Sequence, residues 1–108
     1  MAQGGGPSVR LHRVCTIAPG QGQAAGAFAR GINDYFNEKW PELEIIAFRE
    51  AILPSAQIHW VTQYENMAAW ADARGVLFQD RGYQDLVQKG QGTFVPQSCN
   101  DTLFTNIE

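Results

Sequence analysis

The chain has 108 residues, a size typical of one domain, and 44% of them are hydrophobic, enough for a single packed core. A formal net charge of −3, with no run of Lys or Arg, excludes the basic surface that nucleic-acid binding requires. No apolar stretch approaches the ~20 residues of a membrane-spanning helix, and the first residues lack the basic and apolar regions of a secretory signal. Composition therefore predicts a cytoplasmic protein that binds neither nucleic acid nor membrane.

The N-terminal half predicts a tail, a strand and a helix. Residues 1–8 are rich in glycine and polar side chains and predict a disordered tail, which leaves residues 9–108 as a single domain. Residues 9–17 carry several β-branched side chains and predict the first strand. Residues 21–39 have apolar side chains at spacings of three and four, which predicts a helix that Pro41 ends.

The rest of the chain predicts three more strands and an elaborated helical segment. Residues 42–53 and 57–64 predict two strands joined by a short hairpin connection at residues 54–56. Asn66 is a good N-cap for a second helix, which Gly75 ends or bends. Short helical turns are expected at residues 76–79 and 83–89, a loop at 90–97, and a last strand at 98–107.

The order of these elements, β-α-β-β-α-β, predicts an α+β fold of the ferredoxin-like type with a four-stranded antiparallel sheet. Right-handed crossovers place both helical segments on one face of such a sheet. The strands at residues 45–48 and 58–61 nevertheless carry apolar side chains on both sides. In a sheet with one solvent-exposed face, apolar and polar side chains alternate more regularly along each strand. We therefore expect a second copy of the chain to cover the other face and form a homodimer.

A short segment carries a resemblance to a known superfamily. A strand ends in the aromatic Tyr64 and is followed by the acidic Glu65, the cap Asn66 and a helix with an early Trp70. In this pattern and in its element order, the chain resembles the dimeric α+β barrel superfamily, which includes antibiotic-biosynthesis monooxygenases and NIPSNAP-type proteins. The resemblance covers residues 9–108 and implies a homodimer with a pocket between sheet and helices in each subunit.

Aromatic and histidine side chains on the first and third strands are the candidate site residues. His59 and Trp60 are adjacent in one strand and must face opposite sides of the sheet. Trp60 and Tyr64 share a face and form a candidate wall for a flat substrate, or they are core aromatics. His59 is the best candidate general acid or base, with His12 on a neighbouring strand as its partner; the alternative is that both histidines are structural.

Arg49 and the two cysteines complete the candidates. Arg49 interrupts an apolar strand and needs a partner, which is either a bound anion of the substrate or an ion pair at the sheet edge. Cys15 and Cys99 are expected to be thiols, although their strands pair in this topology and a disulfide could form under oxidation. Motifs for a metal, nucleotide or serine-hydrolase site are missing, so no metal or other cofactor is predicted.

Three functional hypotheses follow. The first is a cofactor-independent enzyme of natural-product biosynthesis that oxygenates or cyclises a flat, aromatic polyketide-like substrate. The second is a dimer that binds a hydrophobic or aromatic small molecule without catalysis, or that assists a partner enzyme. The third is a haem-binding protein of the same fold with His59 or His12 as the axial ligand.

Overall fold

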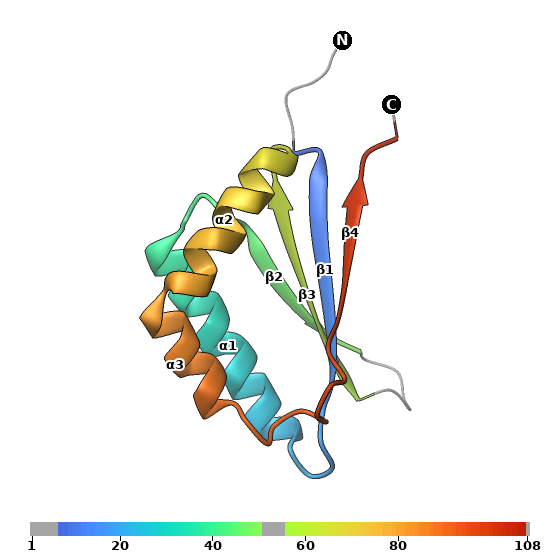
Figure 1. Ribbon diagram of the computed structural model, residues 1–108. Helices are drawn as coiled ribbons and strands as arrows, with labels where there is room; N and C mark the ends of the chain where they lie inside the picture. The colour runs from blue at the N-terminus through green and yellow to red at the C-terminus, as the bar shows by residue number, and fades with distance from the viewer. Residues whose placement is uncertain (1–6, 51–55, 108) are drawn as a thin grey trace.

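Four strands form one antiparallel sheet with all helices on one side of it, as Figure 1 shows. The computed structural model describes residues 7–50 and 56–107. The strand order is β2-β3-β1-β4, which is the ferredoxin-like topology that the order of elements predicted. The elements are β1 (Val9–Thr16), α1 (Gly22–Lys39), β2 (Ile45–Arg49), β3 (Gln57–Tyr64), α2 (Met67–Gln79), α3 (Arg81–Lys89) and β4 (Asn100–Thr105).

The predicted boundaries hold best for β1, α1 and β3 and least for β2. The second strand begins only at Ile45, because Leu43 donates a backbone hydrogen bond to the Trp40 carbonyl in a turn after α1. β2 and β3 are antiparallel neighbours, as a hairpin requires, while the predicted strand end at 51–53 and most of the connection at 54–56 lie outside the described residues. At the other end of β3, the backbone N–H of Ser8 donates to the Glu65 carbonyl, so contacts with the folded chain begin one residue before the predicted boundary.

The second helical segment breaks in the gap predicted between the turns at residues 76–79 and 83–89, but not at Gly75. Asn66 caps α2 as expected, and its side-chain oxygen accepts a hydrogen bond from the Ala69 backbone N–H at 2.8 Å. Gly75 does not interrupt α2, and residues 76–79 form its last turn. The break lies at Asp80, whose extended backbone ends α2 and whose carboxylate caps α3 by accepting from the Tyr83 N–H.

Asp80 also connects the C-terminal end of α1 to the junction between α2 and α3. Its carboxylate accepts hydrogen bonds from the Lys39 ammonium and the Tyr35 hydroxyl, each at 2.5 Å, so the end of α1 is fastened to the junction of α2 and α3. The hydrogen bond from Lys39, followed by that from Tyr35, lowers the pKa of Asp80 to about 2. The carboxylate is therefore ionised in the folded protein at pH values where an unfolded chain would begin to protonate it.

We expect Asp80→Asn to lower the melting temperature at neutral pH and to reduce the loss of stability in acid. Because the folded pKa is lower than the ordinary value of 3.8, the stabilisation by Asp80 is present above that value and is lost as the pH falls toward about 2. Asparagine still caps α3, so the variant removes only the charge. Thermal unfolding from pH 7 down to pH 2 measures the effect, with the exposed Asp34→Asn of α1 as the control. Equal acid sensitivity of Asp80→Asn and the wild type would contradict this role.

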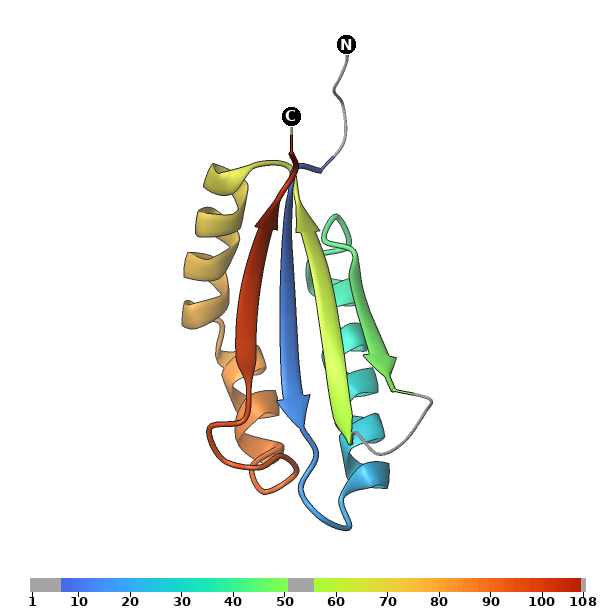
Figure 2. The same ribbon diagram turned by 90° about the vertical axis from the view of Figure 1, so that its right-hand side faces the viewer.

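The core lies between the sheet and α1. Ala25 and Ala29 are buried and allow the helix to lie close to the sheet, against Ile58 and Trp60. In the described chain no residue of α2 or α3 is buried, so these two helices cover the sheet loosely. The opposite face of the sheet carries no helix and is turned toward the viewer in Figure 2. None of the described helices has the length and apolar character needed to cross a lipid bilayer.

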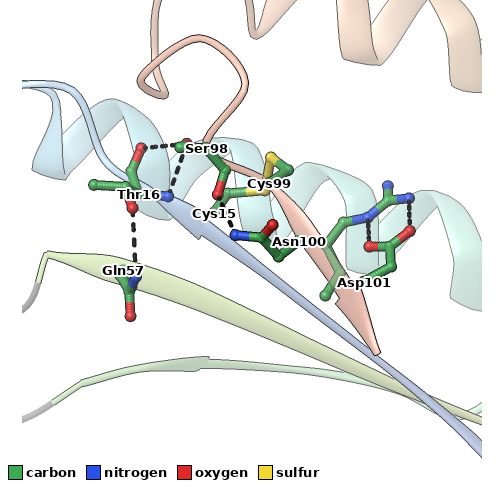
Figure 3. Close-up of a disulfide and its surroundings, with 8 residues drawn as sticks. Cys15, Thr16, Gln57, Ser98, Cys99, Asn100 and Asp101 are labelled. Carbon is green, nitrogen blue, oxygen red and sulfur yellow. Dashed lines mark hydrogen bonds and ion pairs between the residues drawn. A yellow bond between two sulfur atoms is a disulfide. The ribbon is translucent and has the colours of Figure 1, made fainter. Parts of the chain in front are cut away.

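Cys15 and Cys99 form a disulfide, shown in Figure 3, so the expectation of two free thiols was wrong. The two residues lie one step beyond the Val14–Asn100 pair of the antiparallel ladder, and their Cα atoms are 4.1 Å apart. Cys15 is a buried core residue, so the disulfide holds the start of β4 against β1. The thiol expectation rested on the predicted compartment, whereas the strand register places the two sulfur atoms in bonding position.

Candidate ligand-binding cleft and histidine pair

A cleft of about 1,200 Å³ lies between the sheet and the α2–α3 layer. The helix α2 stands away from the strands and leaves this space open, which is why none of its side chains is buried. Trp70, Ala73 and Leu77 line it from α2, and Leu11 and Leu103 line it from the sheet. Its volume slightly exceeds the ~300–1,000 Å³ usual for small-molecule sites, and its mainly apolar walls with a few polar groups are typical of them.

The polar groups of the cleft centre on Arg13 and Asp101. These residues face each other across β1 and β4, and the guanidinium donates two hydrogen bonds to the carboxylate, at 2.6 and 2.8 Å. The hydrogen bonds from Arg13 lower the pKa of Asp101, and Arg74 on α2 adds to this effect. Asp101 is therefore a firmly ionised, weakly basic carboxylate that orients Arg13 rather than a general base.

The structure separates the two predicted aromatic wall residues. Tyr64 lines the cleft, its hydroxyl accepts a hydrogen bond from the Thr62 hydroxyl at 3.1 Å, and burial raises its pKa. Trp60 does not line the cleft. It is only 7% exposed and packs edge-on against Phe28 and Phe94 in the core. The alternative interpretation, a core aromatic, therefore describes Trp60.

Arg49 lies at the sheet edge, the place that one of its two interpretations expected, but its hydrogen-bond partner is a backbone carbonyl. Its side chain is exposed at the sheet edge, where β2 lies, and its Nη2 donates to the Gly22 carbonyl at 2.8 Å. Gly26 allows this approach, because a Cβ atom there would stand 2.6 Å from the same nitrogen. Solvent rather than a buried partner stabilises the charge of Arg49, which lies outside the cleft beside α2.

His12 and His59 lie together on the open face of the sheet, as their neighbouring strands predicted. His12 Nε2 is 3.0 Å from His59 Nδ1, and His59 Nε2 is 3.5 Å from a carboxylate oxygen of Glu50. His59 and Trp60 face opposite sides, as the strand period requires. The two histidines are therefore separated by the sheet from Tyr64 and the cleft.

Sequence reasoning missed most of the cleft. Arg13, Trp70, Arg74 and Asp101 are absent from the candidate site residues that the sequence indicated. One signal was available, because a charge at residue 13 on the core-facing side of a strand requires an opposite charge on the neighbouring strand. Asp101 alternates onto that side of the last strand. Only the distance between α2 and the sheet shows that Trp70 lines a cavity.

The fold and the cleft define a class, the ferredoxin-like α+β proteins with a ligand-sized space under their second helical segment. Solved structures of the NIPSNAP type share this fold. A NIPSNAP family protein from Agrobacterium tumefaciens is 17% identical, with a TM-score of 0.74, and the match covers 100% of this chain and 93% of the other. A NIPSNAP domain protein from Burkholderia xenovorans is 9% identical, with a TM-score of 0.74 over 92% and 94% of the two chains.

A third solved structure belongs to the antibiotic-biosynthesis monooxygenase type, the other group that the sequence resembles. It is a candidate antibiotic biosynthesis monooxygenase from Deinococcus radiodurans, 9% identical, with a TM-score of 0.68 over 93% of both chains. No family model and no curated protein sequence matches the chain. At these identities the structural likeness confirms the expected fold of the NIPSNAP and monooxygenase type, and it leaves the activity to be argued from the site.

Proposed function

We propose that this protein binds a flat, hydrophobic small molecule with an acidic oxygen in the α2–sheet cleft and oxygenates or cyclises it without a bound cofactor. The cleft itself is the observation that supports this function. Its volume suits an aromatic polyketide-like molecule, and Trp70 on α2 and the edge of the buried Tyr64 border it. Arg74 supplies a positive charge, while Arg13 is paired with Asp101 and three further carboxylates also line the walls, those of Glu42, Glu65 and Asp72.

The cleft residues suit a reaction that passes through an oxygen anion. Cyclisation of a poly-β-ketone begins with an enolate, and oxygenation of a phenol begins with a phenolate. Arg74, an exposed guanidinium at the cleft, is the group that would stabilise such a charge, because Arg13 is already paired with Asp101. Burial raises the pKa of Tyr64, so its hydroxyl stays protonated at neutral pH and can donate a hydrogen bond to the same oxygen.

A second candidate function, binding without catalysis, is favoured by the position of the histidines. His12 and His59 are the only histidines of the chain, and both lie on the sheet face opposite the cleft. Their predicted acid–base role stays a prediction that requires a site on the open face. A haem in the cleft with either histidine as axial ligand is disfavoured for the same reason. Binding of phenols and β-ketones with no product detected by mass spectrometry would favour this second function.

We expect Ala73→Trp to weaken ligand binding in the cleft about tenfold or more, since the added indole fills space that the ligand needs. The probe is 8-anilinonaphthalene-1-sulfonate, a flat aromatic anion whose fluorescence reports binding. Ala71→Trp is the matched control, because Ala71 is exposed on the same helix and does not line the cleft. Arg74→Gln should weaken binding of this anion several-fold. Equal affinity of the two tryptophan variants would refute the cleft as the binding site.

We also propose that two copies of the chain pair through the open face of the sheet. An antiparallel sheet that faces water carries polar side chains on that side. Here the exposed side carries Ile46 and Phe48 on β2 and Phe104 on β4, each close to half exposed, with Val14 and Val61 on the central strands between them. These apolar side chains lie on all four strands, between polar ones such as Arg10, His12 and Gln63, and they fit the same surface of a second copy.

We expect Ile46→Asp to convert the dimer to a monomer, because residue 46 lies opposite Val61 and pairing would bury a carboxylate among apolar side chains. Sedimentation velocity measures the change as a halving of the mass. Phe78→Asp is the control: Phe78 is 62% exposed, but it belongs to α2 on the other side of the sheet, so this variant should remain dimeric. A wild-type chain that sediments as a monomer at micromolar concentration would contradict the proposed pairing.

The cytoplasmic location expected from composition stays a prediction, and the disulfide provides its test. Disulfides persist in oxidising compartments and are rare in the cytosol. Alkylation of Cys15 and Cys99 in freshly lysed cells, followed by mass spectrometry, distinguishes the two states. Alkylated thiols support the cytoplasm, and an intact disulfide argues for an oxidising compartment.

A further inference from the structure

The histidine pair on the open face has the arrangement of metal ligands with a supporting carboxylate. Two ring nitrogens, His12 Nε2 and His59 Nδ1, point at each other from 3.0 Å. Behind His59, a Glu50 oxygen lies 3.5 Å from its buried Nε2, within ion-pair distance but not hydrogen-bonded to it. A proton on Nε2 is favoured by this carboxylate, which leaves a lone pair on Nδ1. Histidines that bind metals are commonly oriented in this way by a carboxylate on the other ring nitrogen.

The pair also occupies the middle of the open face. β3 and β1 are the two inner strands of the sheet, and His12 is the fourth of the eight residues of β1. In a two-fold interface, residues near the axis meet the same residues of the second copy, so an axis through the middle of this face brings the two histidine pairs together. Packed sheets lie about 10 Å apart, a distance that two opposing imidazole side chains can bridge.

We propose that His12 and His59 of two copies bind one divalent transition-metal ion, of the Zn²⁺ or Co²⁺ type, at the dimer interface. Tetrahedral Zn²⁺ with Zn–N bonds of about 2.0–2.1 Å separates neighbouring nitrogens by about 3.3 Å, close to the 3.0 Å of the pair. Both imidazole rings turn from their mutual hydrogen bond so that their lone pairs converge on the ion. His12 moves its proton to Nδ1 and presents a Nε2 lone pair. The two Glu50 carboxylates balance the double charge of the ion.

The second copy is required for this site. Among the residues that the structure describes, no three His, Cys, Asp or Glu side chains of one chain converge on a point that could hold a metal. One chain supplies two imidazoles, which is half of a tetrahedral set. The inference therefore rests on the proposed dimer, and it is independent of the ligand-binding cleft on the other side of the sheet.

The test is a titration of the tag-free, chelator-treated full chain with Zn²⁺ by calorimetry and with Co²⁺ by visible absorption. We expect one ion per two chains, with the intense visible bands of tetrahedral cobalt. His59→Gln and His12→Gln should each weaken binding more than 100-fold, and Glu50→Gln about 10- to 100-fold. Gln63→Ala, on the same face of β3, is the matched control and should bind as the wild type does.

Three outcomes would overturn the site, and they separate it from the dimer. If the wild-type protein is a dimer but binds Zn²⁺ no more tightly than the His59→Gln variant does, the metal site is refuted and the proposed dimer is retained. A monomer that binds one ion per chain shows that no second copy completes the site. A chain that stays monomeric and binds no ion removes both proposals together. The affinity for the anilinonaphthalene probe tests the cleft separately in each case.

Discussion

Reduction of the Cys15–Cys99 disulfide is expected to lower the free energy of unfolding by about 2–4 kcal/mol. The two cysteines are 84 residues apart, so the bond closes nearly the whole domain into a loop and restricts the unfolded chain. For a domain of this size the loss corresponds to a melting temperature lower by roughly 10 to 25 °C. Urea unfolding with and without a reductant measures it.

The double variant Cys15→Ala/Cys99→Ala provides the control for the reductant. It should be less stable than the oxidised wild type and insensitive to reduction. The disulfide also holds the beginning of β4, two residues before Asp101, against β1. We therefore expect reduction to weaken probe binding in the cleft as well. A reduced protein with unchanged stability would show that the strand ladder alone holds β4.

Trp60→Ala is expected to cost about 3–5 kcal/mol of stability, the usual loss for a buried aromatic residue. The Trp60 ring is 7% exposed and contacts Phe28 and Phe94, with ring centroids 6.2 and 5.9 Å away. Trp60→Phe should cost much less. It keeps an aromatic ring in the core and removes a buried indole N–H that has no hydrogen-bond partner among the described residues.

Trp70 is expected to affect probe binding rather than stability, the reverse of Trp60, so the two tryptophans can be compared directly. It is half-buried on α2 and lines the cleft. We expect Trp70→Ala to leave stability nearly unchanged and to weaken probe binding, while Trp60→Phe keeps probe affinity at the wild-type value. Denaturant unfolding and fluorescence titration of the same two variants measure both quantities. Loss of probe affinity in Trp60→Phe would return Trp60 to the binding site.

Part of the candidate site could be predicted because it depends on strand geometry alone. The period of two along β3 separates His59 from Trp60, and the neighbouring positions of β1 and β3 bring His12 to His59. The position of Tyr64 at a strand end next to the capped helix α2 likewise followed from local sequence. These features need the order of the strands but no knowledge of how tightly the layers pack.

The errors arise where packing or solvent decides. Trp60 and Tyr64 share a sheet face, and only the position of the helices puts one in the core under α1 and the other in a cleft. Arg49 lies at the sheet edge, as one of its two interpretations expected, but only the close approach of α1 at Gly26 shows that its partner is the Gly22 carbonyl. The redox state of Cys15 could not be read from composition, because it depends on a cross-strand distance.

By itself, the sequence determined the order of elements, the antiparallel sheet with its helices on one side, the start of α2 at Asn66 and the end of α1 before Pro41. It could do so because hydrophobic period, capping and proline geometry act over a few residues. The tertiary structure alone decided the disulfide, the Arg13–Asp101 pair and the cleft under α2. These depend on distances between elements far apart in the chain, which are set by how α1 packs closely on the sheet and α2 does not.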